Sequence, residues 1–350
     1  MKNRKNSLKS KVPVVVTLTA LAKRLGLTPG TVSGVLNNTE ASARVPERTR
    51  KRIHETAREL RYKPNFLARS LRVKRTHTVG VIAQEIGDIY GALVISGVER
   101  YLRQHHYFFL TVAHQRDPQL LQSYSDLLVS RGAEGIITVD TSITEAPSLP
   151  TVAIAGHRHM DGVTNIIIDH QRAAQMALTH LTDLGHRRIA LMKGPPTSSD
   201  TEARWAAICE AADALKNRIR PQFFTQMLSS ATPLPGYEAT KEFLGRSRGF
   251  TALFTYNDLA AIGAIRAIDE AGLRVPEDIS VVGFDDIPSA AYTRPSLTTV
   301  RQPLLKMGEI AARTLLEQIE KRSDYVPEIA IEPEFVIRES TAKAPIRAKT

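Results

Sequence analysis

The chain has 350 residues, of which 42% are apolar, so it is long enough for two or three domains with well-packed cores. No stretch approaches the roughly 18 consecutive apolar residues of a membrane span, and the short run Val12–Val16, broken by Pro13, is not expected to act as a signal-peptide core. The single cysteine, Cys209, excludes an intrachain disulfide and a cysteine-based metal site, which fits a reducing, cytoplasmic location.

Positive charge is concentrated at the beginning of the chain. The formal net charge is +11, but residues 1–75 contain 8 Lys and 11 Arg against 4 Glu and no Asp, so this segment carries +15 and the remainder −4. Such an asymmetry indicates a segment that binds a polyanion, joined to an ordinary acidic domain. A disordered basic tail is the alternative, but the segment has a regular helical pattern.

Two short helices are predicted within residues 17–36. The first begins near Thr17, which suits an N-cap, and ends at Gly26, because glycine accepts the left-handed conformation of a sharp turn. The second begins at Thr28, with Pro29 in its first turn. Their apolar residues are expected to form one small core: Leu21, Leu25, Leu27, Val32 and Val35. This arrangement predicts a helix-turn-helix whose second helix is exposed for the major groove of DNA.

Two more helices are predicted before residue 75. One begins at Pro46 and runs to Tyr62, with apolar residues at helical spacing and basic residues on its other faces. The other is a short helix over residues 65–72. It is too short to be stable alone in water, which suits a segment that folds on contact with DNA.

Eight segments of the chain form a recognisable series. Near the beginning they are Leu18–Gly26, Thr31–Asn37, Val45–Arg50 and Tyr62–Arg72. Farther on they are Thr78–Ile82, Gly185–Ala190, Asn257–Ala264 and Ile279–Ile287. In combination and in order these motifs are specific, and through them the chain, from about residue 17 to residue 340, resembles the lactose-repressor and purine-repressor (LacI) family of transcription regulators.

The resemblance implies that the second helix reads DNA in the major groove. The family's base-reading positions fall on Pro29, Gly30 and Gly34. Positions that hold the helix against the groove and the phosphates fall on Thr31, Ser33 and Asn37. None of the base-reading residues offers the bidentate partners on which direct readout depends. Either thymine methyls, backbone groups and DNA shape carry the specificity, or the specificity is modest.

The helix over residues 65–72 corresponds to the hinge helix of the family. Its Leu71 matches a leucine that wedges into the minor groove at the operator centre, so that two such residues, one from each subunit, kink the duplex. The alternative is that Leu71 only packs between domains. The other residues carried over as DNA contacts are Thr17, Tyr62, Asn65, Ala68, Arg69 and Arg72.

From Thr78 onward, short apolar runs alternate with helical segments. This alternation predicts parallel sheets with helices on both faces, which bind ligands beyond the carboxyl ends of their strands. The resemblance implies the two-lobed α/β fold of periplasmic binding proteins, with one lobe roughly over residues 78–175, the other roughly over 176–305, and a return to the first lobe near 300. The predicted strands cover 79–83, 107–112, 135–139, 152–155, 188–192, 252–255 and 280–284, and the predicted helices cover 90–104, 119–131, 171–184, 203–215 and 258–271.

The resemblance implies an effector between the lobes. Arg204, Asn257 and Asp285 match effector contacts of the family. The fork of an arginine suits carboxylates, phosphates or vicinal oxygens, whereas Asn and Asp suit hydroxyls or ring nitrogens. The residues expected on the other wall follow the first two strands: Gln84, Asp88, Tyr90 and Arg116.

Three further residues bear on the ligand. Asp258 and Asp286 are as compatible with helix capping as with effector binding. Ala155 stands where sugar-sensing members often carry an aspartate, so a simple hexose is less favoured. A purine, a nucleoside, an organic acid or a phosphorylated sugar remains open.

No cofactor, metal site or catalytic set is expected. His105–His106 and His157–His159 are interpreted as exposed surface, because no acidic residue stands at ligand spacing. Lys193–Ser199 lacks the Gly-Lys-Ser/Thr end of a phosphate loop. The alternatives are a transport binding protein and a sugar- or nucleoside-processing enzyme, and the helix-turn-helix is evidence against both.

The predicted organisation has five parts. They are a basic extension (1–16), a helix-turn-helix domain (17–64), a hinge helix with a linker (65–77), a two-lobed effector-binding and dimerisation domain (78–340) and a tail (341–350). The expected partners are a pseudo-palindromic double-stranded DNA operator, a small-molecule effector and a second copy of the chain, with no membrane partner. The expected protein is a nucleoid-associated regulator rather than an enzyme, and its operator affinity changes with the angle between the lobes.

Overall fold

A computed structural model describes residues 16–64, 70, 74–145, 148–216, 223–246, 249–322 and 325–345 of the chain. Its contacts divide the chain into two units, Met1–Thr76 and His77–Thr350, each with an apolar core of its own. Apart from Ser70, the hinge helix predicted over residues 65–72 lies outside the described residues, and so do the predicted DNA contacts within it, Asn65, Ala68, Arg69, Leu71 and Arg72.

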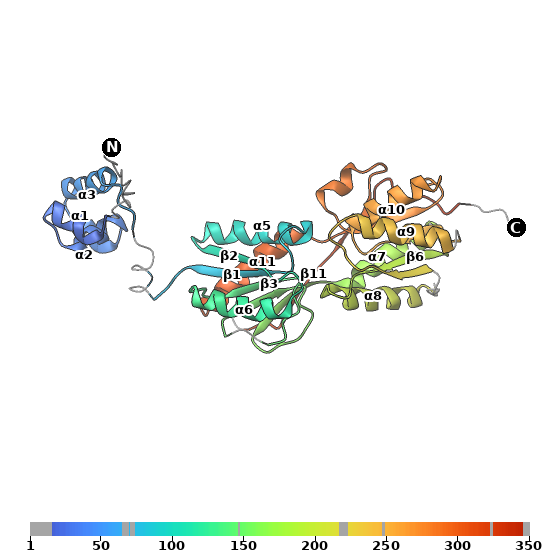
Figure 1. Ribbon diagram of the computed structural model, residues 1–350, viewed down its shortest axis with the longest axis horizontal. Coiled ribbons are helices and arrows are strands. Elements are labelled where there is room, and N and C mark those ends of the chain that lie inside the picture. The colour runs from blue at the N-terminus through green and yellow to red at the C-terminus, as the bar shows by residue number, and fades with distance from the viewer. Residues whose placement is uncertain are drawn as a thin grey trace, which may run out of the picture. The chain divides into compact units, whose positions relative to one another are not determined.

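The described part of the first unit begins with the predicted helix-turn-helix (Figure 1). The predicted caps are confirmed: Thr17 Oγ1 accepts a hydrogen bond from Ala20 N–H at 3.2 Å, and Gly26 has the left-handed φ of 66°. Thr28 caps the second helix by accepting from Thr31 N–H at 3.2 Å. The elements are α1 (Leu18–Leu25), α2 (Pro29–Leu36), the 3-10 helix η1 (Glu40–Arg44) and α3 (Glu47–Glu59).

Helices α1, α2 and α3 enclose a small apolar core, as the sequence predicts. Each contributes buried residues, and Leu27 packs against them. The guanidinium of Arg52 donates to the carbonyl of Leu25 at 2.6 Å, so α3 satisfies one of the carbonyl groups that the end of α1 leaves unpaired. The buried residues are Leu21, Ala22, Leu25, Val32, Val35, Ile53 and Ala57.

The second unit contains two six-stranded sheets, one in each lobe. In the first lobe all strands are parallel, in the order β11-β5-β4-β3-β1-β2. Alternate residues of β1 point to opposite faces, with Val79 and Val81 toward α5 and α11 and Ile82 toward α6 (Figure 1). The elements are β1 (Thr78–Ala83), α5 (Ile89–Gln104), β2 (Phe108–Ala113), α6 (Pro118–Ser130), β3 (Ile136–Val139), β4 (Thr151–Ile154), β5 (Val163–Ile168), α11 (Leu304–Ile319) and β11 (Glu328–Ile331).

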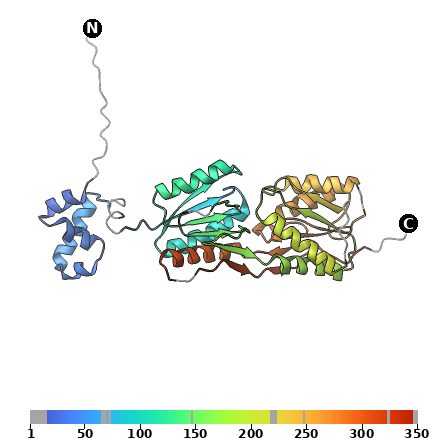
Figure 2. The same cartoon turned by 90° about the horizontal axis from the view of Figure 1, so that it is seen from below.

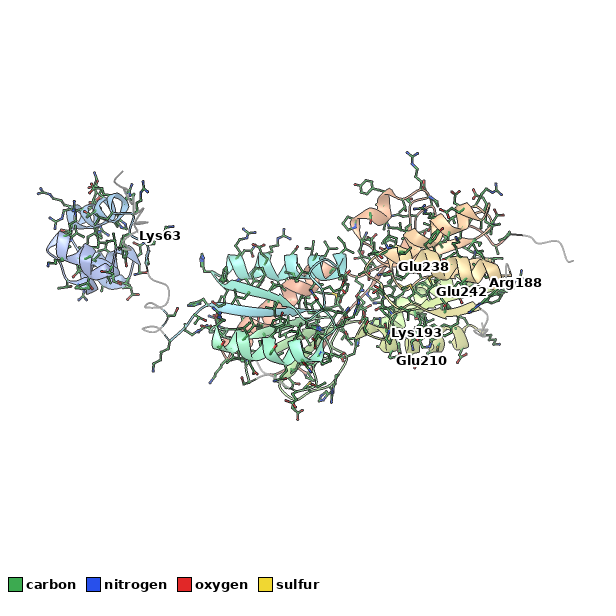
Figure 3. The ribbon with its side chains drawn as sticks, in the orientation of Figure 1. Lys63, Arg188, Lys193, Glu210, Glu238 and Glu242 are labelled. Carbon is green, nitrogen blue, oxygen red and sulfur yellow. The ribbon has the colours of Figure 1, made fainter. Side chains whose placement is uncertain are left out.

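The sheet of the second lobe has the order β12-β10-β9-β8-β6-β7 and is parallel except for β12. Helices α9 and α10 pack on one face, and α7 and α8 pack on the other. Charged residues cover the outer sides of α8 and α9, among them Glu210, Glu238 and Glu242 (Figure 3). The elements are α7 (His170–Asp183), β6 (Ile189–Lys193), α8 (Asp200–Ala214), β7 (Phe224–Gln226), α9 (Leu234–Arg246), β8 (Ala252–Phe254), α10 (Asp258–Glu270), β9 (Ser280–Asp285), η3 (Pro288–Tyr292), β10 (Thr298–Arg301) and β12 (Glu334–Val336).

The chain crosses between the lobes three times: between β5 and α7, between β10 and α11, and between β11 and β12. The first crossing lies at Asp169, earlier than the boundary expected near residue 175, and the return follows β10, as expected near 300. Figure 2 shows the consequence, because α11, late in the chain and red, packs with the lobe that residues 78–168 begin. The predicted α/β architecture of parallel sheets with helices on both faces is confirmed.

Candidate functional site

A cavity of about 30 Å³ lies where the carboxyl ends of strands from both lobes meet. The first lobe contributes Asp88, Tyr90 and Asp140. The second lobe contributes Ser198, Asp200, Arg204, Ser230, Tyr256, Asn257 and Asp285. The cavity has room for roughly two water molecules, so the lobes lie close together around a polar site.

Asp140 connects the lobes. Its carboxylate follows β3 in the first lobe and accepts hydrogen bonds from Ser198 Oγ at 3.0 Å and from the backbone N–H and hydroxyl of Ser199 at 3.0 and 2.7 Å. The hydroxyl of Ser199 also contacts the carbonyl of Ala155, at the end of β4. Burial raises the pKa of Asp140, as does the nearby charge of Asp200, while the bonds from Ser199 lower it.

Asp200 and Arg204 form a buried ion pair on α8, with Nη2 and Oδ2 2.5 Å apart. Arg204 also donates to the carbonyl of Tyr256 at 2.7 Å, and its guanidinium lies 4.5 and 3.9 Å from the ring centroids of Tyr256 and Phe284. Although burial raises the pKa of Asp200, the charges of His170 and Arg204 hold it well below its usual range. Both terminal nitrogens of Arg204 are therefore already paired.

Asp285 and Asp88 are carboxyl groups of a different kind. Asp285 ends β9 with a φ of 110°, accepts from Gln302 Nε2 at 2.7 Å, and is 5% exposed. Burial raises the pKa of Asp285 to about 7, against the opposing effect of Arg204. Asp88 caps α5 by accepting from the N–H groups of Tyr90 and Gly91, and burial raises its pKa as well.

The remaining cavity residues are uncharged. The hydroxyl of Tyr256 exchanges a hydrogen bond of 2.8 Å with Ser198. Asn257 caps α10 by accepting from Ala260 N–H at 2.9 Å, and its amide donates to the carbonyl of Ser230 at 3.0 Å. The hydroxyl of Tyr90 is buried and has no hydrogen-bond partner within the described residues.

Five of the seven predicted effector residues line this cavity: Asp88, Tyr90, Arg204, Asn257 and Asp285. The other two, Gln84 and Arg116, line a neighbouring cavity of about 290 Å³ in which Arg116 pairs with Glu85 at 3.2 Å. The two cavities share Asp140.

Asp258 and Asp286 have contacts within the protein. Asp258 accepts from Thr299 Oγ1 at 2.6 Å and from Ile287 N–H at 2.8 Å, while Asn257, not Asp258, caps the helix. Asp286 pairs with Arg301 and Arg338, each at 2.6 Å. Neither residue lines the cavity.

Asp140 and Asp200 line the cavity but were not among the residues predicted from the sequence. Asp140 directly follows the strand predicted over residues 135–139, so the rule on carboxyl strand ends could have found it. Asp200 begins α8 and has no comparable signal.

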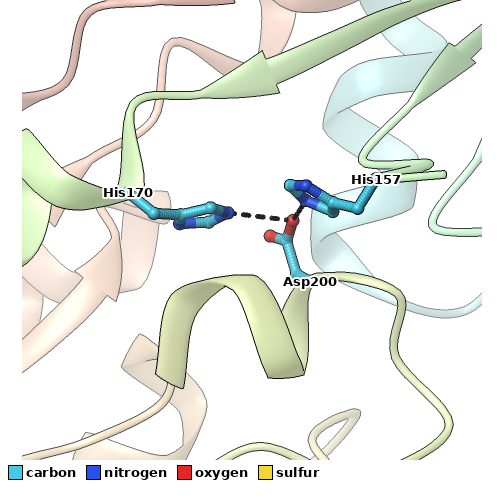
Figure 4. A group of neighbouring side chains, drawn as sticks. All are labelled: His157, His170 and Asp200. Atoms are coloured by element: carbon cyan, nitrogen blue, oxygen red, sulfur yellow. Dashed lines mark hydrogen bonds and ion pairs between the residues drawn. The ribbon is translucent and has the colours of Figure 1, made fainter. Parts of the chain in front are cut away.

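The expectation for His157 was wrong. Its side chain is 14% exposed and contacts Asp200, an acidic residue far away in the sequence (Figure 4). His105, His106 and His159 are exposed, as expected.

The predicted DNA-binding residues of the first unit differ in exposure. Pro29 and Gly30 are exposed at the start of α2, and Thr31 is half-buried, with its hydroxyl 2.9 Å from that of Thr28. Ser33 is buried, and its carbonyl accepts from the amide of Asn37 at 2.7 Å.

Three more of the predicted DNA contacts belong to this unit. Thr17 is the exposed cap of α1, whereas Gly34 and Tyr62 are half-buried, Tyr62 against the apolar core. The same unit exposes many cations: Lys23, Arg24, Arg44, Arg48, Arg50, Lys51, Arg58 and Lys63 (Figure 3 labels Lys63). Within the described residues, no helix is both long and apolar enough to cross a membrane.

Two models of known protein families match this chain, one in each of its two units. The model described as "Bacterial regulatory proteins, lacI family" matches residues 17–65, and the model described as "Periplasmic binding protein-like domain" matches residues 178–341. The HTH-type transcriptional repressor PurR of Haemophilus influenzae is 30% identical over 338 residues, which cover 93% of this chain and 98% of the relative. The corresponding repressor of Pasteurella multocida is 31% identical over 338 residues, with the same coverage.

Solved structures match the whole architecture. The Lac repressor dimer bound to operator and the anti-inducer ONPF superposes with a TM-score of 0.84 at 25% identity, covering 94% of this chain and 99% of that one. The complex of the transcriptional regulator CelR with cellobiose superposes with a TM-score of 0.68 at 26% identity, covering 93% and 99%. The chain belongs to the lacI family of bacterial regulatory proteins and is a DNA-binding transcriptional repressor with a periplasmic-binding-protein-like effector domain.

Proposed function

We propose that this repressor binds a pseudo-palindromic operator as a homodimer and that a small molecule held between its lobes sets its operator affinity. The observation that supports this most directly is the polar cavity to which both lobes contribute. A ligand there contacts both lobes, so its affinity depends on how they are arranged, and only such a difference can shift a conformational equilibrium. No catalytic turnover is part of the proposal, and a repressor of chromosomal genes acts in the cytoplasm.

The charge of the site favours an uncharged or cationic effector that carries hydrogen-bond donors. Four carboxyl groups line the cavity against one guanidinium, and the pKa of about 7 leaves Asp285 partly protonated at neutral pH. That guanidinium is paired with Asp200, and Arg116 of the neighbouring cavity is paired with Glu85. An added phosphate or carboxylate would face excess negative charge in a desolvated site. A polyol, a nucleobase or a nucleoside instead presents hydroxyl, amino or ring N–H donors to these acceptors.

The effector must bind a more open arrangement of the lobes. A sugar or nucleobase site has a volume of roughly 300 Å³ or more, whereas the cavity has about 30 Å³. Hydrogen bonds from Ser198 and Ser199 to Asp140 hold this closed arrangement. We expect the ligand to replace these cross-lobe bonds and to change the angle between the lobes.

Leu71, outside the described residues, is proposed as the wedge at the operator centre. Leu71→Ala should weaken operator binding at least about tenfold, because the kinked duplex loses the side chain that props it open. Binding to a random duplex should hardly change, since phosphate contacts supply it, and both affinities should fall steeply with salt. Anisotropy titrations of the full-length protein at two salt concentrations measure this, and an equal loss on both duplexes would remove the wedge role.

The function itself is tested in two stages with the full-length protein. Selection of bound duplexes from a random library should return a pseudo-palindrome. Operator binding should then respond to a neutral sugar, nucleobase or nucleoside, and Asp285→Asn should weaken that response, while the exposed Asp126→Asn should not. Recovery of no consensus would overturn the operator proposal. A response confined to sugar phosphates or organic acids would overturn the effector class.

A further inference from the structure

Two imidazoles and a carboxylate, side chains of the kinds that bind metal ions in proteins, meet beside the effector cavity. Figure 4 shows the imidazoles of His157 and His170 on either side of the carboxylate of Asp200. His170 Nε2 lies 3.2 Å from Asp200 Oδ1, His157 Nε2 contacts the same oxygen, and the candidate ligand atoms all lie within 4.8 Å of one another. The side chains are 14%, 6% and 6% exposed in the order His157, His170 and Asp200.

The two lobes both contribute to this group of three residues. His157 follows β4 in the first lobe, whereas His170 and Asp200 are the first residues of α7 and α8 in the second lobe. The second lobe therefore carries two of the three side chains whatever the angle between the lobes. The third, His157, reaches them only when the lobes are close together.

We propose that His157, His170 and Asp200 form a site for a divalent transition metal of the Zn²⁺ class, which fastens the two lobes together. Two imidazole nitrogens and one carboxylate oxygen are a ligand set that suits Zn²⁺, whereas Ca²⁺ and Mg²⁺ prefer oxygen ligands alone. Three protein ligands leave one position of a tetrahedral site for water or for an oxygen of the effector. Asp200 also lines the effector cavity, so the site borders that cavity.

The surroundings support a cation at this place. Asp88, Asp140 and Asp285 line the same cavity, and the cation of Arg204 is already paired with Asp200. Arg204 binds the second oxygen of Asp200 at 2.5 Å, which holds the carboxylate in place and leaves Oδ1 toward the imidazoles. Such support from a residue behind the ligand orients metal-binding carboxylates in general.

The location of the site gives the metal a regulatory consequence. Because the open arrangement offers two ligands and the closed arrangement offers three, the metal binds the closed arrangement more tightly and shifts the lobes toward it. The metal thus acts on the same equilibrium as the organic effector. This regulatory consequence rests on the proposed effector-controlled function, whereas the metal site itself does not.

The test is metal binding by the full-length protein in the absence of DNA and effector. After chelator treatment and dialysis, Zn²⁺ is titrated against a chromophoric competitor, and Co²⁺ is added as a spectroscopic probe. The wild type should bind one high-affinity Zn²⁺ per chain, and Co²⁺ should give the visible absorption of a four-coordinate site. His157→Asn and His170→Asn should bind Zn²⁺ at least about 100-fold more weakly.

His159→Asn is the matched control, since His159 is exposed two positions from His157, and it should bind like the wild type. Thermal unfolding in chelator shows whether each variant is folded. Equal binding by the wild type and both ligand variants, or no binding by the folded wild type, would overturn the site. These outcomes leave the operator and effector experiments unaffected. Operator titrations with and without Zn²⁺ then test the regulatory consequence, and an identical operator affinity in both would overturn it.

Discussion

Asp285 shows how a single residue links the effector site to stability. It is buried at the end of β9, and this burial raises its pKa from 3.8 to about 7, against the opposing charge of Arg204. Between these values the folded protein binds a proton that the unfolded chain has released. The contribution of Asp285 to the free energy of unfolding is therefore fully present below about pH 4 and is lost as the pH rises through 7.

This linkage predicts the behaviour of Asp285→Asn. An asparagine cannot ionise. Between pH 4 and pH 7.5 the free energy of unfolding of the variant should therefore fall by roughly 2–4 kcal/mol less than that of the wild type. Part of the decline should remain, because burial also raises the pKa of Asp88, Asp140 and Asp258. Urea unfolding at several pH values measures the difference. Asp126 is exposed, so Asp126→Asn should show the same dependence of the unfolding free energy on pH as the wild type. If Asp285→Asn also showed the wild-type dependence, the raised pKa of Asp285 would be contradicted.

Both lobes contain the same kind of helix pairing. In the first lobe, a Cβ at Gly97 of α5 would come 2.0 Å from the carbonyl oxygen of Leu305, and one at Gly308 of α11 would come 2.0 Å from that of Val94. In the second lobe, a Cβ at Gly263 of α10 would come 2.0 Å from a backbone carbonyl oxygen beside α9. The helices of each pair thus touch backbone to backbone, where no side chain fits.

Alanine substitutions distinguish two effects on stability. One is the clash of an added Cβ with the neighbouring backbone, and the other is the ordinary stabilisation when alanine replaces glycine in a helix. Gly97→Ala and Gly263→Ala must push rigid backbone apart and should each destabilise the protein by about 3 kcal/mol or more. Gly245→Ala on α9 is the control, because nothing lies within 4 Å of its added Cβ. It should stabilise the protein by about 0.5–1 kcal/mol. Chemical unfolding measures all three, and a mild effect at Gly97 would mean that α5 and α11 can separate.

The elements also show what local sequence can predict. The caps of α1 and α2, the turn at Gly26 and the buried β1 depend on neighbouring residues, and their prediction is confirmed. The strands β5, β7, β10, β11 and β12 and the helices α9 and α11 were not predicted, although the sequence contains them. Strand β11 is half-exposed at the edge of its sheet, so it lacks the continuous apolar run that marks a buried parallel strand.

The site residues likewise differ in whether the sequence could predict them. Resemblance to a family led to Arg204, Asn257 and Asp285, and all three line the cavity. The cluster of His157, His170 and Asp200 could not be predicted, because its residues are far apart in the sequence and His157 meets the first residues of α7 and α8 only when the lobes pack. His157 lies two positions from the exposed His159, and the local sequence contains no signal that distinguishes the burial of the two.

At the scale of the whole molecule, the proposed function requires the contacts between the two lobes to break when the lobes open and to form again when they close. Three hydrogen bonds from Ser198 and Ser199 reach Asp140, and Ser199 also contacts the carbonyl of Ala155. All of them join loops that follow strands, so the lobes can separate without disturbing either core. Across the lobes, His157 also contacts Asp200 and Ile89 packs against the core of the second lobe, so the closed arrangement is held by a few contacts whose individual contributions are small.

Ser199→Ala tests this view, because it removes one hydroxyl and leaves the backbone N–H bond to Asp140 in place. Loss of a hydrogen bond to a carboxylate should favour the open arrangement by roughly 1.5–3 kcal/mol, a factor of about 10–150 in the equilibrium constant. The distance between the lobes is followed by fluorescence energy transfer between two dyes, one attached at the exposed position 96 and one at the exposed position 238. Cys209 is replaced by serine so that it carries no dye. The variant should show lower transfer than the wild type, whereas Ser130→Ala, whose hydroxyl bonds only within α6, should not. If Ser199→Ala left the transfer unchanged, apolar packing rather than these bonds would hold the lobes together, and an effector would have to open them by another route.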